Sequence, residues 1–203
     1  MEKVKPTRIE LIKLKVRLKT SGRGHKLLKE KRDGLMKEFM EVIRAAKEKR
    51  REMEEELANS LRDFAVISSP LSTAEIEQFF LIPSVKTEIS AEKENIMGVN
   101  IPRFSSEITK GNQSYSYASF PIGLEESISG FAKTFSLMLE LANIEHTARL
   151  LSFEIEKTRR RVNALEYIII PQIERNIKAI YSKLDEAERF EKIVRMKIKS
   201  QIS

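Results

Sequence analysis

The sequence has no cysteine and no tryptophan, and only seven glycines, six prolines, ten phenylalanines and four tyrosines occur among its 203 residues. Without cysteine the chain can form no disulfide and no cysteine-ligated metal site, which is typical of a reducing compartment. No run approaches the ~18 apolar residues that a membrane-spanning helix needs, and the opening MEKVKPTRIEL lacks the apolar segment of a signal peptide. We therefore expect a soluble chain.

Charge is what the sequence has in abundance, since 33% of the residues are Asp, Glu, Lys or Arg. A composition this rich in Lys, Glu, Ile, Leu and Arg is typical of long helices packed along narrow seams. Residues 1–32 hold twelve Lys or Arg against three Glu, and residues 189–203 hold five against one. Because the net charge is +7, the other 156 residues sum to −6. Two basic ends either reach separately for an anionic partner or meet as one basic tip.

The N-terminal part predicts one long helix. Thr7 and Glu10 have the spacing of a capping box, in which each residue's side chain accepts a bond from the backbone N–H of the other. Apolar residues then recur at steps of three, four or seven, which is a heptad pattern and indicates a coiled coil about 87 Å long. The seam residues are Leu11, Leu14, Leu18, Leu28, Leu35, Phe39, Val42, Ala46, Met53, Leu57, Leu61 and Phe64, with Ser21, His25, Arg32 and Lys49 at the remaining seam positions.

The charged block at residues 47–56 lies within this helix. Arg50 with Glu54 and Arg51 with Glu55 have the i, i+4 spacing of ion pairs along a solvated helix face. We favour this interpretation over a binding segment.

Pro70 ends the first helix, and the pattern then changes. Ser72 with Glu75 forms a second capping box, which predicts a short amphipathic helix up to Leu81. Two β-like runs follow at residues 85–89 and 95–101, and we interpret them as a hairpin whose connection is residues 90–94. Residues 103–123 are rich in Ser, Gly and Asn and predict a loop.

The C-terminal part predicts a second long helix, beginning between Leu124 and Phe131. Its seam steps alternate between three and four up to Ile169, become four and four up to Ile177, and then alternate again. The seam residues are Leu141, Ile144, Ala148, Leu151, Ile155, Thr158, Val162, Leu165, Ile169, Ile173, Ile177, Ile180, Leu184, Ala187, Val194 and Ile198.

The two long seams predict the fold class. We expect a mainly α protein in which the N- and C-terminal helices form a long antiparallel two-helix coiled coil, with a small central insertion that contains a short helix and a β-hairpin. The expected segments are residues 1–66 and 124–203 for the two helices and residues 67–123 for the insertion. This arrangement would place both basic ends at one tip.

The stretch TRRRVNALEYIIIPQIE at residues 158–174 departs from an ordinary helix. Its first part places Arg159 and Arg161 beside the seam, where we expect them to pair with carboxylates on the facing helix, and it points Arg160 outward. Its second part, residues 168–170, widens the apolar surface, which would contact either the first helix or a third chain. Pro171 removes a backbone donor where the seam changes phase, so we expect an unpaired Tyr167 carbonyl and a bent helix.

No sequence motif indicates catalysis or cofactor binding. Residues 22–24, Gly-Arg-Gly, lack a preceding strand and the full glycine spacing of a phosphate loop, so we interpret the glycines as permitting close approach or bending. His25 and His146 lie on different elements without a carboxylate cluster of metal-ligand spacing. We therefore predict no catalytic residue, no cofactor and no metal site.

The same stretch carries a family resemblance. With LDEAER, RMKIKSQ, PTRIELIKLKVRL, GRGHKLLKEKRDGL and IMGVNIP, it resembles the D subunit of the archaeal and vacuolar-type rotary ATPases. The resemblance implies a central rotor shaft that is not itself an enzyme and that transmits torque between ATP chemistry and ion translocation. The residues of the family motif and of the expected kink are Arg160, Arg161, Val162, Asn163, Ala164, Leu165, Glu166, Ile170 and Pro171.

The resemblance also implies partners. The basic tip would enter a hexameric head of catalytic and nucleotide-binding subunits, through Arg8, Lys13, Lys15, Arg17, Arg189, Arg195 and Lys199. The small F subunit of the stalk would bind near Phe64 and Phe131, and a socket subunit would join the shaft to the membrane ring, on the cytoplasmic side of the membrane and without insertion into it. The alternative function is a basic coiled-coil protein that binds nucleic acid or an anionic membrane surface, with an affinity that falls steeply with salt.

Overall fold

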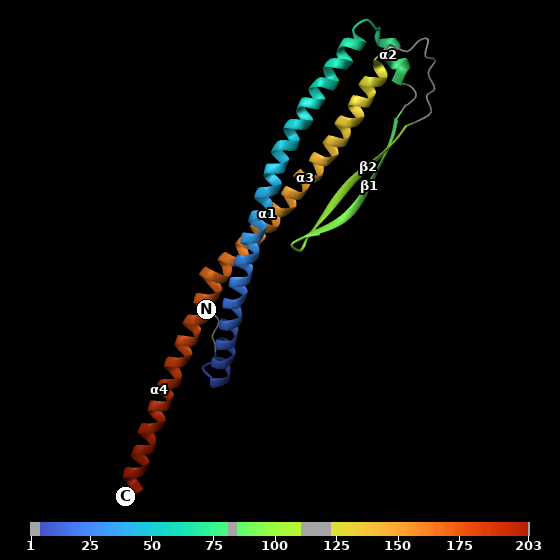
Figure 1. The fold of residues 1–203 in the computed structure, drawn as a ribbon. Helices are drawn as coiled ribbons and strands as arrows, with labels where there is room; N and C mark the ends of the chain where they lie inside the picture. Colours follow the sequence, from blue (N-terminus) through green and yellow to red (C-terminus); the bar gives the residue numbers. More distant parts are fainter. Residues whose placement is uncertain (1–4, 81–84, 111–122, 203) are drawn as a thin grey trace. The chain divides into compact units, whose positions relative to one another are not determined.

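The computed structural model describes residues 5–80, 85–110 and 123–202 (Figure 1). Its elements are α1 (Arg8–Ser68), α2 (Thr73–Phe80), β1 (Val85–Ile96), β2 (Val99–Lys110), α3 (Leu124–Ala164), the π-helix η1 (Leu165–Ile169) and α4 (Ile170–Ile202). The predicted fold class is confirmed, because two long helical segments pack together and a short helix and a hairpin lie between them in the chain.

The contacts divide the chain into two compact units. Residues 1–34 and 155–203 make up one, which we call the terminal unit, and residues 35–154 make up the other, which we call the central unit. Each unit contains a part of α1 packed on a C-terminal helical segment, and each is described by itself below.

The two capping boxes form to different extents. At α2 the box is complete, because the Ser72 N–H donates to Glu75 Oε2 over 2.8 Å and the Glu75 N–H donates to Ser72 Oγ over 3.4 Å. At α1 only one half forms: the Glu10 N–H donates to Thr7 Oγ1 over 3.3 Å, while the Thr7 N–H donates to the Lys5 carbonyl. The predicted return bond from Glu10 is therefore wrong.

In the terminal unit α1 and α4 are antiparallel. Contacts along α1 run backward along the other segment, since Arg8 pairs with Glu188 and His25 with Glu166. Between these pairs lies the apolar core, with Leu14, Ile173 and Ile180 buried and Leu11, Leu18, Ile169, Ile177 and Leu184 packed around them. The predicted seam ends at Leu184, because every described side chain from residue 185 to residue 201 is exposed.

In the central unit α1 packs on α3 through a seam in which large and small residues alternate. Leu35, Leu141, Ala148 and Leu151 are buried. Nearer the end of α1 the seam residue is Ser60, whereas Leu61, which the heptad pattern predicted there, is 51% exposed. The prediction fails because the facing segment of α3 offers a glycine and a threonine, which leave room for a serine between the helices.

The hairpin also belongs to the central unit, and its turn lies elsewhere than predicted. β1 and β2 pair antiparallel from Val85 with Lys110 to Ile96 with Val99, so residues 90–94 are strand and not the connection. Residues 103–110, predicted as loop, are also strand, and the rest of that predicted loop up to residue 122 lies outside the described residues. The chain reverses at Met97 and Gly98, which both have positive φ, at 51° and 85°.

Candidate functional site

The irregular stretch of the C-terminal helix forms a π-turn. η1 spans Leu165–Ile169, and the Ile170 N–H donates to the Leu165 carbonyl, five residues back in place of four. The helix continues on both sides of this turn. The sequence located the irregularity correctly beside Pro171 but predicted only a missing bond, not a widened turn.

Proline gives a physical reason for the position of the turn. In a regular α-helix the ring of Pro171 would press against the carbonyl of Tyr167, and the ring nitrogen has no hydrogen to donate to it. A turn with an extra residue just before the proline opens the backbone at that carbonyl. The Pro171 carbonyl accepts a bond from Arg175 Nε over 3.2 Å.

The three isoleucines before the proline have different environments. Ile169 packs on the core of the terminal unit, Ile170 is half-buried, and Ile168 is 61% exposed. Its neighbour Tyr167 is 70% exposed. Packing against α1 therefore holds for Ile169, and Tyr167 with Ile168 form an apolar pair on the surface.

The arginine run lies on the surface of α3. Arg160 pairs with Glu156 one turn earlier in the same helix, in agreement with its predicted outward direction. Arg159 and Arg161 are exposed, and within the described residues neither forms an ion pair with the facing helix. Their predicted pairing across the seam is therefore not found in the described part of the chain.

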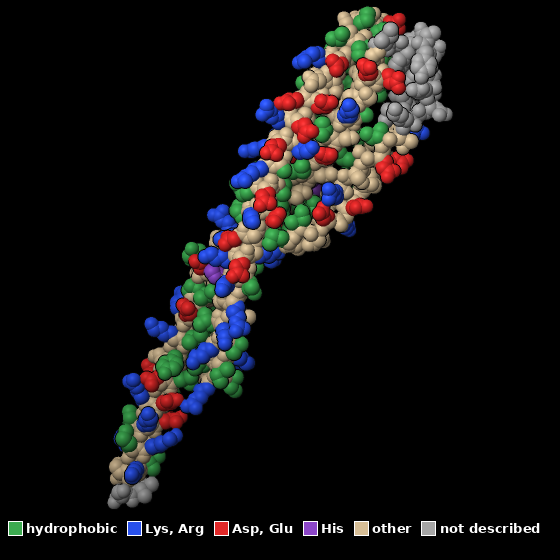
Figure 2. Space-filling model, in the orientation of Figure 1, with side chains coloured by type: hydrophobic (Ala, Val, Ile, Leu, Met, Phe, Trp, Pro, Cys, Tyr) green, Lys and Arg blue, Asp and Glu red, His purple; other side chains and the backbone are tan. Residues whose placement is uncertain are grey.

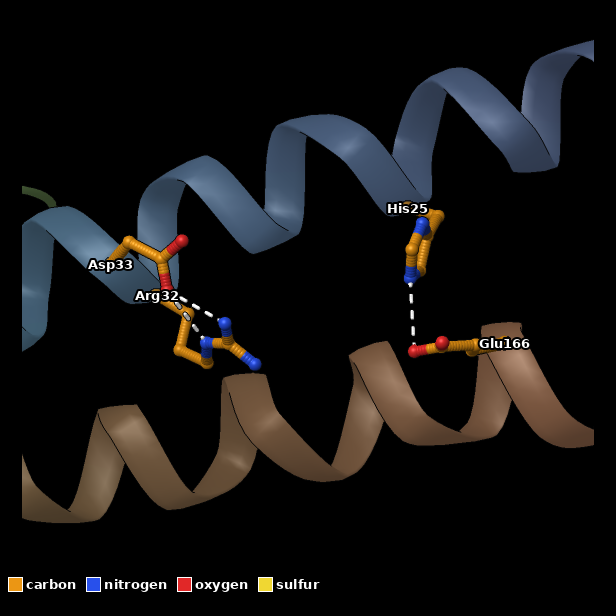
Figure 3. A network of polar contacts seen from close by, with 4 residues as sticks. All are labelled: His25, Arg32, Asp33 and Glu166. Atoms are coloured by element: carbon orange, nitrogen blue, oxygen red, sulfur yellow. Dashed lines mark hydrogen bonds and ion pairs between the residues drawn. The ribbon is translucent and has the colours of Figure 1, made fainter.

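A polar contact crosses the terminal unit at the π-turn. His25 Nε2 of α1 lies 3.4 Å from Oε2 of Glu166, a residue of η1 and of the family motif (Figure 3). Two turns along α1, Arg32 donates to its neighbour Asp33 over 2.7 and 2.9 Å and so turns its charge along its own helix. The sequence showed His25 as a seam residue, but the carboxylate that faces it could not be identified without the helix register.

The predicted tip residues lie on the terminal unit and are exposed. Arg8 pairs with Glu188 over 2.6 Å across the two helices, whereas Arg189 and Arg195 pair within α4 with Asp185 and Glu191. The other members of the set, Lys13, Lys15, Arg17 and Lys199, are also exposed. Basic side chains stand among apolar ones along this unit in Figure 2. Because these cations are solvated, each ion pair contributes little to stability.

Apolar side chains share this surface. They do not fill the seam but stand outside it, between 38% and 69% exposed, and they are Ile9, Ile12, Val16, Phe190, Ile193, Val194, Met196 and Ile198. Exposed apolar groups in such number, with basic groups among them, mark a surface that another protein covers.

Comparison with known proteins decides the family. A family model described as the D subunit of ATP synthase matches residues 10–200. The V-type ATP synthase D subunit of Thermoanaerobacter sp. (strain X514) is 44% identical over 201 residues, which cover 98% of this chain and 96% of that protein. The protein of the same name from Streptococcus pneumoniae (strain Hungary19A-6) is 46% identical over 198 residues, covering 97% of this chain and 98% of that protein. The chain belongs to the family of ATP synthase D subunits.

This confirms the resemblance that the motifs indicated. In this member of the D-subunit family, Phe64 and Phe131 of the central unit contact one another, with ring centroids 5.9 Å apart at an interplanar angle of 72°. Such an edge-to-face pair stabilises the packing of α1 on α3. Beside it lies a groove of about 380 Å³, lined mostly by apolar side chains that include Leu57, Phe131, Phe135 and Met138.

The hairpin of this family member is attached to α3 by one asparagine that the sequence did not reveal. Asn143 Oδ1 accepts a bond from the Phe104 N–H over 2.8 Å, and Asn143 Nδ2 donates to the Phe104 carbonyl over 2.7 Å. Because both backbone groups of Phe104 point at Asn143, they do not bond to Ala91, its partner in β1. Pro102, two residues earlier, has the same orientation and therefore needs no N–H.

Ion pairs flank the seam of the central unit. Lys49 lies 3.0 Å from Glu52 and 3.1 Å from Glu140, and these hydrogen bonds, first to Glu52 and then to Glu140, raise the pKa of Lys49. Arg51 pairs with Glu55 as predicted. Arg50, predicted to pair with Glu54 of its own helix, bonds instead to Glu145 of α3, which raises the pKa of Arg50.

Two features were sought in the described residues and are not present there. No group of three or more His, Cys, Asp or Glu side chains could hold a metal ion. No described helix is both long and apolar enough to cross a membrane. A Cβ at Gly22 or Gly24 would meet no atom within 4 Å, so neither glycine serves a close approach, contrary to one of the two expected roles.

Proposed function

We propose that this chain is the central shaft of an A/V-type rotary ATPase. It would carry torque between ATP synthesis or hydrolysis in the head and ion translocation by the membrane ring, without catalysing either. The observation that carries the proposal is the match over nearly the whole chain to proteins named as the D subunit of V-type ATP synthase. The antiparallel packing of α1 on α4 supports it, since two packed helices resist bending and twisting better than one.

The terminal unit is the part that would enter the hexameric head of catalytic and nucleotide-binding subunits. Arg8, Lys13, Lys15, Arg17, Arg189, Arg195 and Lys199 would face acidic groups of the head, and the exposed apolar side chains between them would touch its apolar groups. The mixture supports a turning contact, because solvated charges attract over a distance while each holds only weakly at one position.

The central unit would bind the small F subunit of the stalk. The packed pair of Phe64 and Phe131 and the groove beside it offer an apolar surface within this unit. A socket subunit would connect the shaft to the ring, and the whole would sit peripherally at the cytoplasmic side of the membrane. The part of the family motif around the π-turn would lie in the portion of the shaft that contacts the head.

Rotation of a marker on the central unit tests the proposal. The chain has no cysteine, so Glu92→Cys in the exposed strand β1 provides one attachment point for a bead in the assembled complex, with the head fixed to a surface. We expect the bead to turn in one direction when ATP is added. A complex that hydrolyses ATP while the bead stays still would contradict a shaft role. A bead attached to one of the head's own subunits is the control that must not turn.

The alternative of a basic coiled-coil protein for nucleic acid or anionic membranes has weaker support. The named relatives favour the role in the stalk. Titration of the purified chain with DNA or with anionic vesicles, at low and at moderate salt, distinguishes the two. We expect binding only at low salt, as for any basic surface, whereas tight binding that persists at moderate salt would favour the alternative.

A further inference from the structure

The seam of the terminal unit contains one residue too many. Before the π-turn, Ile155, Thr158 and Val162 are buried at steps of three and four, and after it Ile173 and Ile180 are buried one heptad apart. From Val162 to Ile173 the chain advances eleven residues, where alternate steps of three and four would need ten. One residue turns an α-helix by about 100°. A continuous α-helix would therefore direct Ile173 and the seam beyond it away from α1.

The π-turn removes this error. A turn closed by a bond over five residues contains one residue more than an α-turn, and the bond from the Ile170 N–H to the Leu165 carbonyl closes such a turn. Because the surplus is taken up within Leu165–Ile169, Ile173 and Ile180 return to the side that faces Leu14. The alternative setting of α4, rotated by one residue, would present Gln172, Asn176, Ala179 and Lys183 to α1 and is therefore strongly disfavoured.

The run of three isoleucines allows the surplus residue to be identified. Deleting any one of residues 168–170 gives the same sequence, Tyr-Ile-Ile-Pro. In an unbroken α-helix, the isoleucine next to the proline would then occupy the seam place that Ile169 has now, and every later seam residue would follow at alternate steps of three and four. The residue lost is in effect the exposed one, Ile168.

We propose that the isoleucine run is one residue longer than the seam requires, that the π-turn stores this residue, and that the length of the run thereby sets the rotational angle at which α4 faces α1. The π-turn is then a fixed phase correction and not a flexible joint. This inference goes beyond the proposed function and does not depend on it, since it concerns only the packing within the terminal unit.

Three full-length variants test the proposal. Pro171→Ala is the common parent, because a proline in an unbroken α-helix would itself disturb the result. To this parent one variant removes an isoleucine from residues 168–170, and the other adds a fourth. Arg8→Cys and Glu188→Cys, placed in all three, report the angle of α4, since these two side chains meet across the helices and the chain has no other cysteine.

The readouts are the yield of cross-link with a short bismaleimide and the urea midpoint from circular dichroism. We expect the deletion to keep the cross-link within about twofold of the parent and to keep the midpoint, because it removes only the stored residue. We expect the addition to lower the cross-link at least about tenfold and to lower the midpoint, because Glu188→Cys is turned by about 100°.

The opposite changes at one site separate this proposal from its competitors. If both length changes are tolerated, the stretch is a flexible joint and the proposal is wrong. If the deletion loses the cross-link or fails to fold, the residue is not surplus, and the proposal is equally wrong. A deletion that behaves like the parent beside an addition that does not is the result that supports it.

Discussion

The most direct test of the packing in the central unit is a single methyl group at Gly130. A Cβ there would lie 3.1 Å from Ser60 Oγ, which is tighter than nearly all real contacts of this kind. Ser60 has little freedom to move, because it is buried and its Oγ lies 3.2 Å from Thr134 Oγ1. The Thr134 hydroxyl donates to the Gly130 carbonyl over 3.0 Å, so the bond between the two hydroxyls is donated by Ser60.

Two opposing terms set the effect of Gly130→Ala. Alanine favours a helix over glycine by about 1 kcal/mol. Displacing Ser60 would break its bond and leave a buried hydroxyl without a partner, which costs about 1–3 kcal/mol. We expect a net loss of about 1 kcal/mol in the free energy of unfolding. Ser60→Ala alone should also cost about 1 kcal/mol for the lost bond, while the double variant should be close to the original protein, because alanine at residue 60 makes room for the methyl group.

Urea unfolding followed by far-UV circular dichroism measures all four proteins, and the coupling between the two sites should reach about 2 kcal/mol. Gly22→Ala is the matched control, since no atom lies within 4 Å of the added carbon, and it should stabilise α1 by about 1 kcal/mol. If Gly130→Ala stabilises the protein as much as Gly22→Ala does, the contact between α1 and α3 is looser than described and the reasoning is refuted.

Three further changes have defined outcomes. Asn143→Ala should raise hydrogen exchange at the Phe104 amide by up to about tenfold, because it removes that amide's acceptor, and unchanged exchange would mean that the hairpin is held by other contacts. The bonds from Ser72, first from its backbone and then from its side chain, lower the pKa of Glu75, so the cap of α2 persists at neutral pH and is lost as pH falls through that lowered pKa; NMR titration should show the shift, and Ser72→Ala should reduce it. Leu151→Ala should lower the free energy of unfolding by about 2–5 kcal/mol in a urea titration, since Leu151 is fully buried, and a loss below about 1 kcal/mol would contradict its core position.

The sequence predicted best those features that depend on neighbours along the chain. The capping box of Ser72 and Glu75 forms as expected because both partners lie within one turn. The heptad pattern gave the two long helices and most buried positions for the same reason. The family motif indicated the family because it is a matter of order and spacing alone.

The features that the sequence did not reveal depend on a second element. The hairpin turn at Met97 and Gly98 lacks the usual Asn-Gly pair, and it forms where the Asn95 side chain accepts a bond from the Gly98 N–H. The pairing of His25 with Glu166 requires the register of two helices 141 residues apart in sequence. Neither contact can be found from periodicity.

The charge of the chain divides along the same boundary as its contacts. The segments of the terminal unit hold 24 Lys or Arg against 11 Asp or Glu, whereas residues 35–154 hold 13 against 19, so the two units carry +13 and −6. Most of these groups are exposed, and fields between exposed charges fade over about 8 Å at physiological salt. Each unit therefore attracts partners of the opposite sign on its own, and neither cancels the other at a distance. On the proposed function this division would direct the terminal unit to an acidic surface of the head and the central unit to basic surfaces of the stalk, so that charge alone favours one orientation of the shaft before any close contact forms.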